Sequence, residues 1–319
     1  MSATSAVKTV LQRTLAELTS CYRPNPPEGS PTDRVIALTP SIGKVKRLAA
    51  GLPPRYAYRS QIGRGAAAYV VLADDLEQKK QVAIKILRPE VATLIGEKRF
   101  RREIEILSGL QHPNILPFID HGATETGSLF LVTPFFTGET LRARLLRERK
   151  LSVADATGIT NDVASALDYA HGNSLIHRDV KPANILLSDG RAIVADFGIS
   201  RATSVDQFAQ ITSSGVSLGT PEYMSPEQIT GEIELDPRTD VYSLGCVAYE
   251  MLSGKPPFTG STSAVFMAHR AQPPRPLRDT RPDIPAAIDE ALMKALEKKR
   301  GSRFLSAGEM ADAMSAATS

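Results

Sequence analysis

IHRDVKPAN, at residues 176–184, is the stretch that decides the fold of this 319-residue chain, and DFG follows it at residues 196–198. Asp179 can accept the proton of an attacking hydroxyl group, and Lys181 can steady a phosphoryl group. Asn184 and the aspartate of the second stretch carry the hard oxygen donors that Mg²⁺ prefers. The two stretches together predict a site for phosphoryl transfer.

Either stretch alone would be weak support, because an ordinary core histidine, turn aspartate or loop can look the same. Further motifs stand in a fixed order along the chain: GRGAAAYV (63–70), VAIK (82–85), FRREI (100–104), GTPE (219–222), SPE (225–227) and DVYSLG (240–245). With these motifs in this order, the chain resembles the protein kinase superfamily from Tyr58 to Ala316, about four-fifths of its length.

The resemblance implies an α+β, two-lobed protein kinase fold, with a small antiparallel β-sheet lobe carrying one helix and a larger, mainly helical lobe. We place the kinase domain at residues 56–319, with the small lobe at 56–136 and the large lobe at 137–319. A hydrophobic content of 42% in a chain of this length is sufficient for two lobes. Residues 1–55 are interpreted as an N-terminal extension made of a short helix and a proline-rich linker.

The extension divides into three parts. Apolar residues recur at helical spacing in residues 5–20, which predicts a short amphipathic helix, and prolines in residues 22–34 predict a linker. Residues 35–55 mix apolar and basic side chains; a poorly ordered lead-in is the favoured interpretation, and a segment docked on the kinase surface or on a partner is the alternative. Catalysis is expected to be intrinsic to residues 56–319, with at most a modest effect of the extension.

Periodicity predicts the regular elements of the remaining chain. Strands are expected at residues 58–62, 69–74, 81–87 and 129–136. Helices are expected at residues 91–111, 152–171, 239–253, 264–272, 285–299 and 307–316.

The resemblance implies ATP as the nucleotide and Lys85 as the residue that holds its α- and β-phosphates. Gly63 and Gly65 lack side chains, so the backbone can approach the phosphates. Ala68 stands where the family has a third glycine, and we expect its methyl group to be tolerated. Glu103, on the helix after the third strand, is expected to orient Lys85.

The resemblance also implies the full set of site residues. The residues expected to bind ATP are Ile62, Gly63, Gly65, Val70, Ala83, Lys85, Thr133, Phe136 and Leu186. The expected catalytic residues are Asp179, Lys181, Lys85 and Glu103, and the expected Mg²⁺ ligands are Asn184 and Asp196. Phe136 is expected to supply the hinge N–H group because Pro134 has none.

Three arginines, Arg99, Arg178 and Arg201, match positions that in the family converge on a phosphate of the activation loop. Guanidinium groups repel one another without an anion, and a phosphate can bridge them with bidentate hydrogen bonds. Thr212 and Ser214 are the favoured phosphate acceptors by their distance from the GTPE motif. The alternative interpretation of this segment is a polar, flexible loop without a regulatory phosphate.

Further residues are expected to have structural roles, not chemical ones. Asp240 is expected to brace the backbone of the catalytic loop, and Glu227 to form an ion pair with Arg303. Ser225 stands where the family usually has alanine, and we expect this departure to be harmless.

Lys181 and Thr220 are typical of serine/threonine kinases, and the sequence GTPEYMSPEQ at residues 219–228 resembles their bacterial branch. The expected partners are protein substrates with Ser or Thr acceptors and a transient dimer for autophosphorylation. The main alternative is a pseudokinase scaffold that binds nucleotide and partner proteins. A kinase of small molecules is a second alternative, disfavoured by the intact SPE motif.

Composition limits the expected partners and location of the protein. A net charge of +3, without a motif that combines aromatic and basic residues, does not indicate nucleic acid as a partner. Cys21 and Cys246 have neither disulfide-framework nor metal-ligand spacing, which suits a reducing cytosol. No run of about 18 apolar residues predicts a membrane helix. A cytoplasmic location is expected, although a longer parent protein would be compatible with a membrane anchor.

Overall fold

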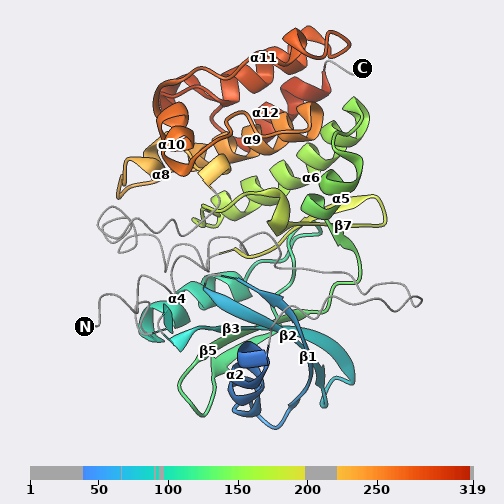
Figure 1. Ribbon diagram of the computed structural model, residues 1–319, viewed down its shortest axis with the longest axis vertical. Helices are drawn as coiled ribbons and strands as arrows, with labels where there is room; N and C mark the ends of the chain where they lie inside the picture. Colours follow the sequence, from blue (N-terminus) through green and yellow to red (C-terminus); the bar gives the residue numbers. More distant parts are fainter. Residues whose placement is uncertain (1–38, 66, 90, 93–96, 198–220, 317–319) are drawn as a thin grey trace. The chain divides into compact units, whose positions relative to one another are not determined.

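Figure 1 presents the computed structural model of the chain, which describes residues 39–65, 67–89, 91–92, 97–197 and 221–316. The chain divides into two compact units. The first unit comprises Met1–Ser108 and Pro117–Glu139, and the second comprises Gly109–Leu116 and Thr140–Ser319. The helix expected at 5–20 and the linker expected at 22–34 lie outside the described residues, and so do the activation-loop acceptors.

The first unit is built on a five-stranded antiparallel sheet with strand order β1-β2-β3-β5-β4. The strands are β1 (Tyr56–Arg64), β2 (Ala68–Asp75), β3 (Lys80–Leu87), β4 (Asp120–Ala123) and β5 (Leu129–Pro134). Helix α4 (Glu97–Ser108) follows β3 and buries Phe100 and Ile104. The predicted helix at 91–111 is therefore confirmed for residues 97–108, and the four predicted strands are present.

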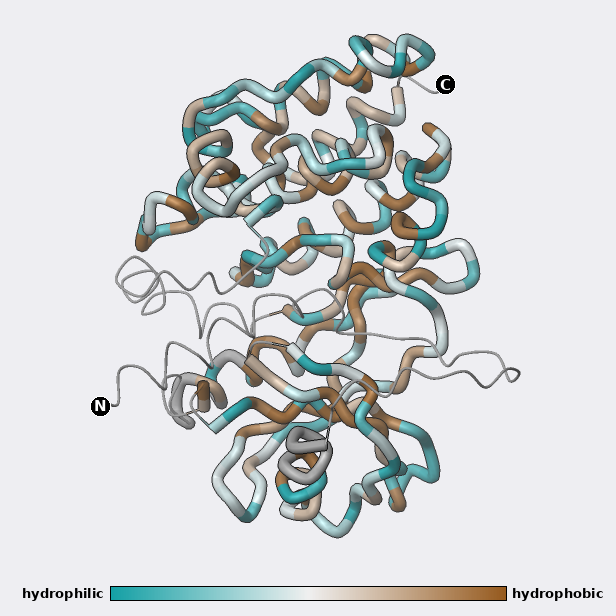
Figure 2. Tube along the Cα trace, viewed as in Figure 1, coloured by the Kyte–Doolittle hydropathy of each residue, from teal (hydrophilic) through white to brown (hydrophobic). Residues whose placement is uncertain are grey.

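Alternation along β2 and β3 gives the sheet two different faces, since successive side chains point to opposite sides. Val71 pairs with Ile84, and Ala73 pairs with Val82; these four side chains are at most 1% exposed. They form the apolar face of the sheet. Figure 2 shows the hydrophobic residues that gather along these strands.

Helix α2 (Thr39–Ala50) covers this apolar face. Val45, Leu48, Ala49 and Leu52 follow one another at helical spacing and are buried in one cluster with the sheet residues. The favoured interpretation of residues 35–55 as a poorly ordered lead-in is therefore wrong for residues 39–50. The sequence did not reveal this because the apolar partners of α2 lie on strands that come later in the chain.

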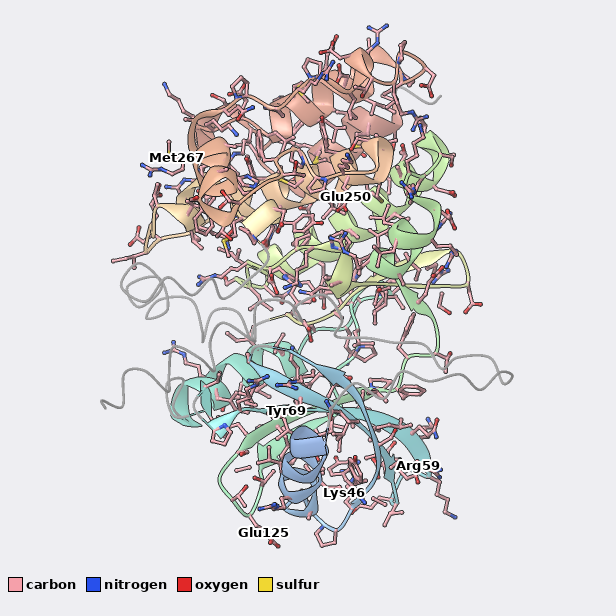
Figure 3. The ribbon with its side chains drawn as sticks, in the orientation of Figure 1. Lys46, Arg59, Tyr69, Glu125, Glu250 and Met267 are labelled. Atoms are coloured by element: carbon pink, nitrogen blue, oxygen red, sulfur yellow. The ribbon has the colours of Figure 1, made fainter. Side chains whose placement is uncertain are left out.

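The end of α2 is tied to the sheet by polar contacts. The carbonyl of Gly51 accepts from the backbone N–H of Glu125 at 2.9 Å, in the turn between β4 and β5. Arg55 donates two hydrogen bonds to the buried carboxylate of Asp75, at 3.0 and 2.7 Å. Figure 3 labels Lys46 on α2 and Glu125 in that turn. The last residues of the expected extension thus belong structurally to the first unit.

We expect Leu48→Ala to lower the free energy of unfolding by about 2 kcal/mol, because the substitution removes a buried side chain and leaves a cavity. Lys46→Ala, on the exposed side of α2, is the matched control and should leave stability unchanged. Urea unfolding of the two variants measures the difference. Equal stabilities would show that α2 does not contribute to the core in solution, and deletion of residues 1–50 would then be tolerated.

The second unit is mainly helical. Its helices are α5 (Leu141–Glu148), α6 (Val153–Gly172), α8 (Pro226–Ile229), α9 (Arg238–Ser253), α10 (Thr262–Ala271), α11 (Ala286–Ala295) and α12 (Ala307–Ser315). Every residue of α9 from Thr239 to Leu252 is buried, so α9 is the central helix of this unit. Gly245 permits close packing there, because a Cβ atom on it would lie 3.1 Å from the Cβ of Ala295.

A small sheet of order β6-β7-β8 lies beside α5 and α6. Its strands are β6 (Glu139–Thr140), β7 (Ile185–Ser188) and β8 (Arg191–Val194), and the last two form a hairpin. The described residues of this unit also form four short 3-10 turns, at Pro182–Asn184, Pro221–Tyr223, Leu277–Asp279 and Arg300–Ser302.

Besides α2, the strands and helices expected from the sequence did not include β4, β6, α5, α8 or the two strands of the β7–β8 hairpin. β4 reads DHGA and has no apolar alternation, and its pairing with β5 defines it. α5 buries only Leu141 and Leu145, too few apolar positions to show a period. Among the described residues, no helix has the length and apolar character needed to span a bilayer.

Candidate active site

His177 organises the loop between α6 and β7, and it is fully buried. Its Nε2 atom lies 2.9 Å from the carbonyl oxygen of Ala195, and its Nδ1 atom accepts from the backbone N–H of Asp179 at 3.2 Å. The ring also contacts Phe197 edge to face, with centroids 4.5 Å apart. With Nδ1 accepting, the Nε2 atom carries the proton that it shares with Ala195, so one buried imidazole joins the IHRDVKPAN stretch to the DFG stretch.

The carboxylate of Asp179 is held by two of the predicted site residues. Its Oδ2 atom lies 2.8 Å from Nζ of Lys181 and accepts from Nδ2 of Asn184 at 3.0 Å. The same Asn184 nitrogen donates to the backbone carbonyl of Asp179 at 2.8 Å. The structure thus brings together three residues that the sequence singled out. The ammonium group of Lys181 lies beside the carboxylate of Asp179, and Asp179 remains partly exposed.

Asn184 and Asp196 come from the two sides of the β7–β8 hairpin. Ile185 pairs with Val194, and the N–H of Ala195 donates to the carbonyl of Asn184 at 2.9 Å. This bond continues the ladder to the residue next to Asp196. Because the amide nitrogen of Asn184 is committed to Asp179, its oxygen is the atom left for a cation. An amide oxygen and a carboxylate form a donor set that fits Mg²⁺.

Asp240 braces the catalytic loop from α9, as expected. Its carboxylate accepts from the backbone N–H groups of His177 and Arg178, both at 2.8 Å, and lies 2.8 Å from Nε2 of His171. Burial alone would raise the pKa of Asp240, but the bond with His171, the nearby imidazoles and the Arg178 N–H hold it below its ordinary value. His171 was missed by the sequence analysis, because only folding brings it to Asp240.

The segment after the activation loop is fixed to the same unit by Tyr223. The hydroxyl group of Tyr223 binds both Arg142 and the carboxylate of Glu250, and Arg142 also donates to Glu250 at 2.8 Å. Burial, reinforced by the negative charge of Glu250, holds the pKa of the phenol well above its ordinary value. Figure 3 labels Glu250 among the helices of this unit. None of these three residues was singled out from the sequence.

Five of the residues expected at the nucleotide lie at positions on one face of the first unit's sheet. Gly63 pairs with Val70, and Val70 pairs with Lys85. Ala83 pairs with Thr133 on the neighbouring strand. Since directly paired residues project to the same side, these side chains lie on the face opposite α2. Ile62 precedes Gly63 in β1, and Phe136 follows β5.

The glycine-rich turn is closed by a hydrogen bond from the N–H of Gly65 to the carbonyl of Ala68, at 2.8 Å. Arg88 donates to the carbonyl of Gly65 at 2.7 Å. The side chain of Ala68 is buried, so its methyl group fits inside the first unit. Its tolerance beside the phosphates stays a prediction.

Several predicted contacts stay predictions. The backbone of Glu103 lies in α4, but its side chain is outside the described residues, as is that of Arg99. Arg201, Thr212 and Ser214 also lie outside them. Leu186 is buried in β7 of the second unit, whereas the other expected ATP-binding residues belong to the first.

Residues 56–310 match the family model of the protein kinase domain. With this match, and with this fold and catalytic loop, the chain belongs to the protein kinase family. Serine/threonine-protein kinase PknB of Mycobacterium tuberculosis is 40% identical over 265 residues, which cover 81% of this chain and 42% of that protein. PknJ of Mycobacterium bovis is 38% identical over 271 residues, covering 82% of this chain and 45% of that protein.

Solved structures agree with this assignment. The crystal structure of the Mycobacterium tuberculosis PknI kinase domain superposes with a TM-score of 0.68 at 32% identity, covering 84% of this chain and 99% of that one. The chain spans less than half the length of the curated relatives that it matches. The resemblance to bacterial serine/threonine protein kinases that the sequence indicated is confirmed.

Proposed function

We propose that this chain transfers the γ-phosphoryl group of ATP to serine or threonine hydroxyl groups of proteins. The observation that carries the proposal is the arrangement around Asp179, whose carboxylate is held by Lys181 and Asn184. A partly exposed carboxylate can accept the proton of a substrate hydroxyl group, and the adjacent ammonium group can neutralise negative charge on the transferring phosphoryl group.

Mg²⁺, when bound with ATP, would neutralise charge on the phosphates, and Asn184 and Asp196 would hold it. Asp196 has a backbone φ of 66°, a left-handed conformation that aspartate tolerates better than most residues. Lys85 would hold the α- and β-phosphates from the first unit, and Glu103 would orient Lys85. Ile62, Gly63, Gly65, Val70, Ala83, Thr133, Phe136 and Leu186 would surround the rest of the nucleotide.

The test is incubation of the purified protein with Mg-ATP and a generic basic protein, followed by phosphosite mapping by mass spectrometry. We expect phosphate on Ser and Thr residues of the substrate. Nucleotide binding without any transfer would support the pseudokinase scaffold instead, and transfer to small acceptors alone would support a small-molecule kinase.

We further propose that the kinase domain comprises residues 56–319, with lobes at 56–136 and 137–319, and that residues 1–55 extend it. A transient dimer for autophosphorylation and a cytoplasmic location also remain proposals that rest on the sequence. Burial of α2 against the first unit supports a structural contribution of the extension.

We expect autophosphorylation between Asp196 and Glu227, with Thr212 or Ser214 as the main acceptor. The phosphate would give Arg99, Arg178 and Arg201 a common anion, since a phosphate near −2 charge can bind several guanidinium groups. Phosphatase-treated and autophosphorylated protein are compared in turnover and by mass spectrometry. Equal turnover of the two forms would contradict a regulatory phosphate even if the site is modified.

A further inference from the structure

Gln228, in α8, connects two parts of the second unit that are about fifty residues apart in sequence. Its Nε2 atom donates to the backbone carbonyl of Arg178 at 2.7 Å. Its Oε1 atom accepts from the backbone N–H of Ser225 at 3.0 Å. One side chain therefore bridges the start of α8 and the residue immediately before Asp179.

The orientation of the Gln228 amide is set by the start of the helix. Ser225 caps α8, because its hydroxyl oxygen accepts from the backbone N–H of Gln228 at 3.3 Å. The reciprocal bond from the Ser225 N–H to Oε1 completes a capping box. With Oε1 engaged there, the amide nitrogen points away from the cap and toward Arg178. The serine that stands in place of the family's alanine thus takes part in a defined structure, without harm to the fold.

The peptide group that Gln228 contacts is the one that joins Arg178 to Asp179. Its carbonyl oxygen accepts from Gln228, and its N–H donates to Nδ1 of His177 at 3.2 Å. Both polar groups of this peptide are therefore held by side chains. The plane of the peptide sets the direction in which the Asp179 side chain leaves the backbone.

Arg178 needs such support because its backbone is strained. Its φ is 68°, in the left-handed region that residues other than glycine rarely adopt. Asp240 holds the N–H of Arg178 at 2.8 Å, and Gln228 holds its carbonyl. Without the second contact, the peptide that follows Arg178 could rotate while the first contact stayed in place.

We propose that Gln228 is a positioning residue for phosphoryl transfer: by holding the Arg178–Asp179 peptide it sets the direction of the Asp179 carboxylate. This inference rests on the proposed function, because it assigns the role of Gln228 to the same reaction. It also gives the segment that follows the activation loop a contact with the catalytic loop through the backbone of Arg178. That contact is separate from any contact of the Arg178 guanidinium group.

The test compares Gln228→Glu with Ser225→Ala, each at a phosphorylation level matched to the wild type by mass spectrometry. The first variant keeps an oxygen for the Ser225 N–H but replaces the donor to Arg178 with a second acceptor. The second variant removes the capping hydroxyl group and keeps the Gln228 amide. We expect kcat to fall about tenfold in Gln228→Glu, with KM for ATP within about twofold of the wild type. Ser225→Ala should lower Tm and leave kcat unchanged.

Two further readouts separate positioning from a general loss of structure. Lowering the pH should raise the kcat of Gln228→Glu relative to the wild type, because the introduced carboxyl group regains a proton to donate to the Arg178 carbonyl. Gln228→Ala, which adds no charge, should show the same fall in kcat without this recovery. Hydrogen exchange of residues 176–184 should be faster in both Gln228 variants and unchanged in Ser225→Ala.

A kcat within twofold of the wild type in both Gln228 variants would overturn the proposal. Equal falls in kcat in Gln228→Glu and Ser225→Ala would overturn it too. If the wild type itself shows no transfer, the proposed function fails, and the hydrogen-exchange comparison still decides whether Gln228 holds the loop. Unchanged exchange of residues 176–184 in the Gln228 variants would refute the positioning role in that case.

Discussion

Asp179→Asn is expected to lower kcat by at least ~10²-fold while ATP binding changes little, because the carboxylate acts on the acceptor hydroxyl group and not on the nucleotide. The amide that replaces the carboxylate cannot accept a proton at neutral pH. The substitution also removes the negative partner of Lys181, whose Nζ lies 2.8 Å from Oδ2 in the wild type. Initial rates with a protein substrate and binding of a nucleotide analogue are the two measurements.

Asp189→Asn is the matched control. Asp189 is exposed in the turn between β7 and β8, so this substitution makes the same chemical change away from the site. It should keep wild-type turnover. Asp196→Asn is expected to weaken Mg-ATP binding and catalysis together, unlike the change at Asp179. More than a tenth of wild-type activity in Asp179→Asn would contradict the assignment of Asp179 as the proton acceptor.

Arg303→Leu is expected to destabilise the protein by about 3–5 kcal/mol, because it leaves the carboxylate of Glu227 buried without its cationic partner. The pair is bidentate, with Nη1–Oε1 and Nη2–Oε2 distances of 2.7 and 2.9 Å, and the side chains are 0% and 2% exposed. Thr239 donates to the same carboxylate at 2.8 Å. The ion pair expected from the sequence is thus confirmed and lies inside the second unit. Denaturant unfolding measures the loss.

Arg300→Leu provides the control, since Arg300 contacts Glu232 at 2.7 Å in a pair that is 29% and 45% exposed. A solvent-exposed pair of this kind contributes only about 0–1 kcal/mol. Similar losses of stability in Arg303→Leu and Arg300→Leu would mean that burial does not determine how much the Glu227–Arg303 pair stabilises the protein.

The pH dependence of the Glu227 pair has a definite sign. Burial alone would raise the pKa of Glu227, but Arg303 and Thr239 hold it below its ordinary value. The pair therefore stabilises the protein above the unfolded-state pKa of about 4.3, and this contribution is lost as the pH falls through the folded-state pKa. In Arg303→Leu, burial without the cation raises the pKa of Glu227, so the loss of stability relative to the wild type should be largest at neutral pH and shrink in acid. A loss of stability that stays constant with pH would contradict its assignment to the ionised carboxylate of Glu227.

Much of the fold could be predicted because its signals are local. The strand alternation of β2 and β3 and the helices α6, α9, α10 and α12 were recognised from residues within each element. β4 and α5 were not recognised, because β4 is polar and α5 buries two leucines only. Tertiary pairing, and not intrinsic pattern, makes these two elements regular.

By itself, the sequence determined the class of protein and the chemistry. Asp179, Lys181 and Asn184 lie within six residues, so the backbone of one loop already brings them together. Only the tertiary structure decided that α2 covers the sheet, that His171 supports Asp240, and that Gln228 holds the Arg178 carbonyl. Each of these contacts joins residues distant in sequence, and a residue's burial and hydrogen-bond partner are defined only once the chain has folded.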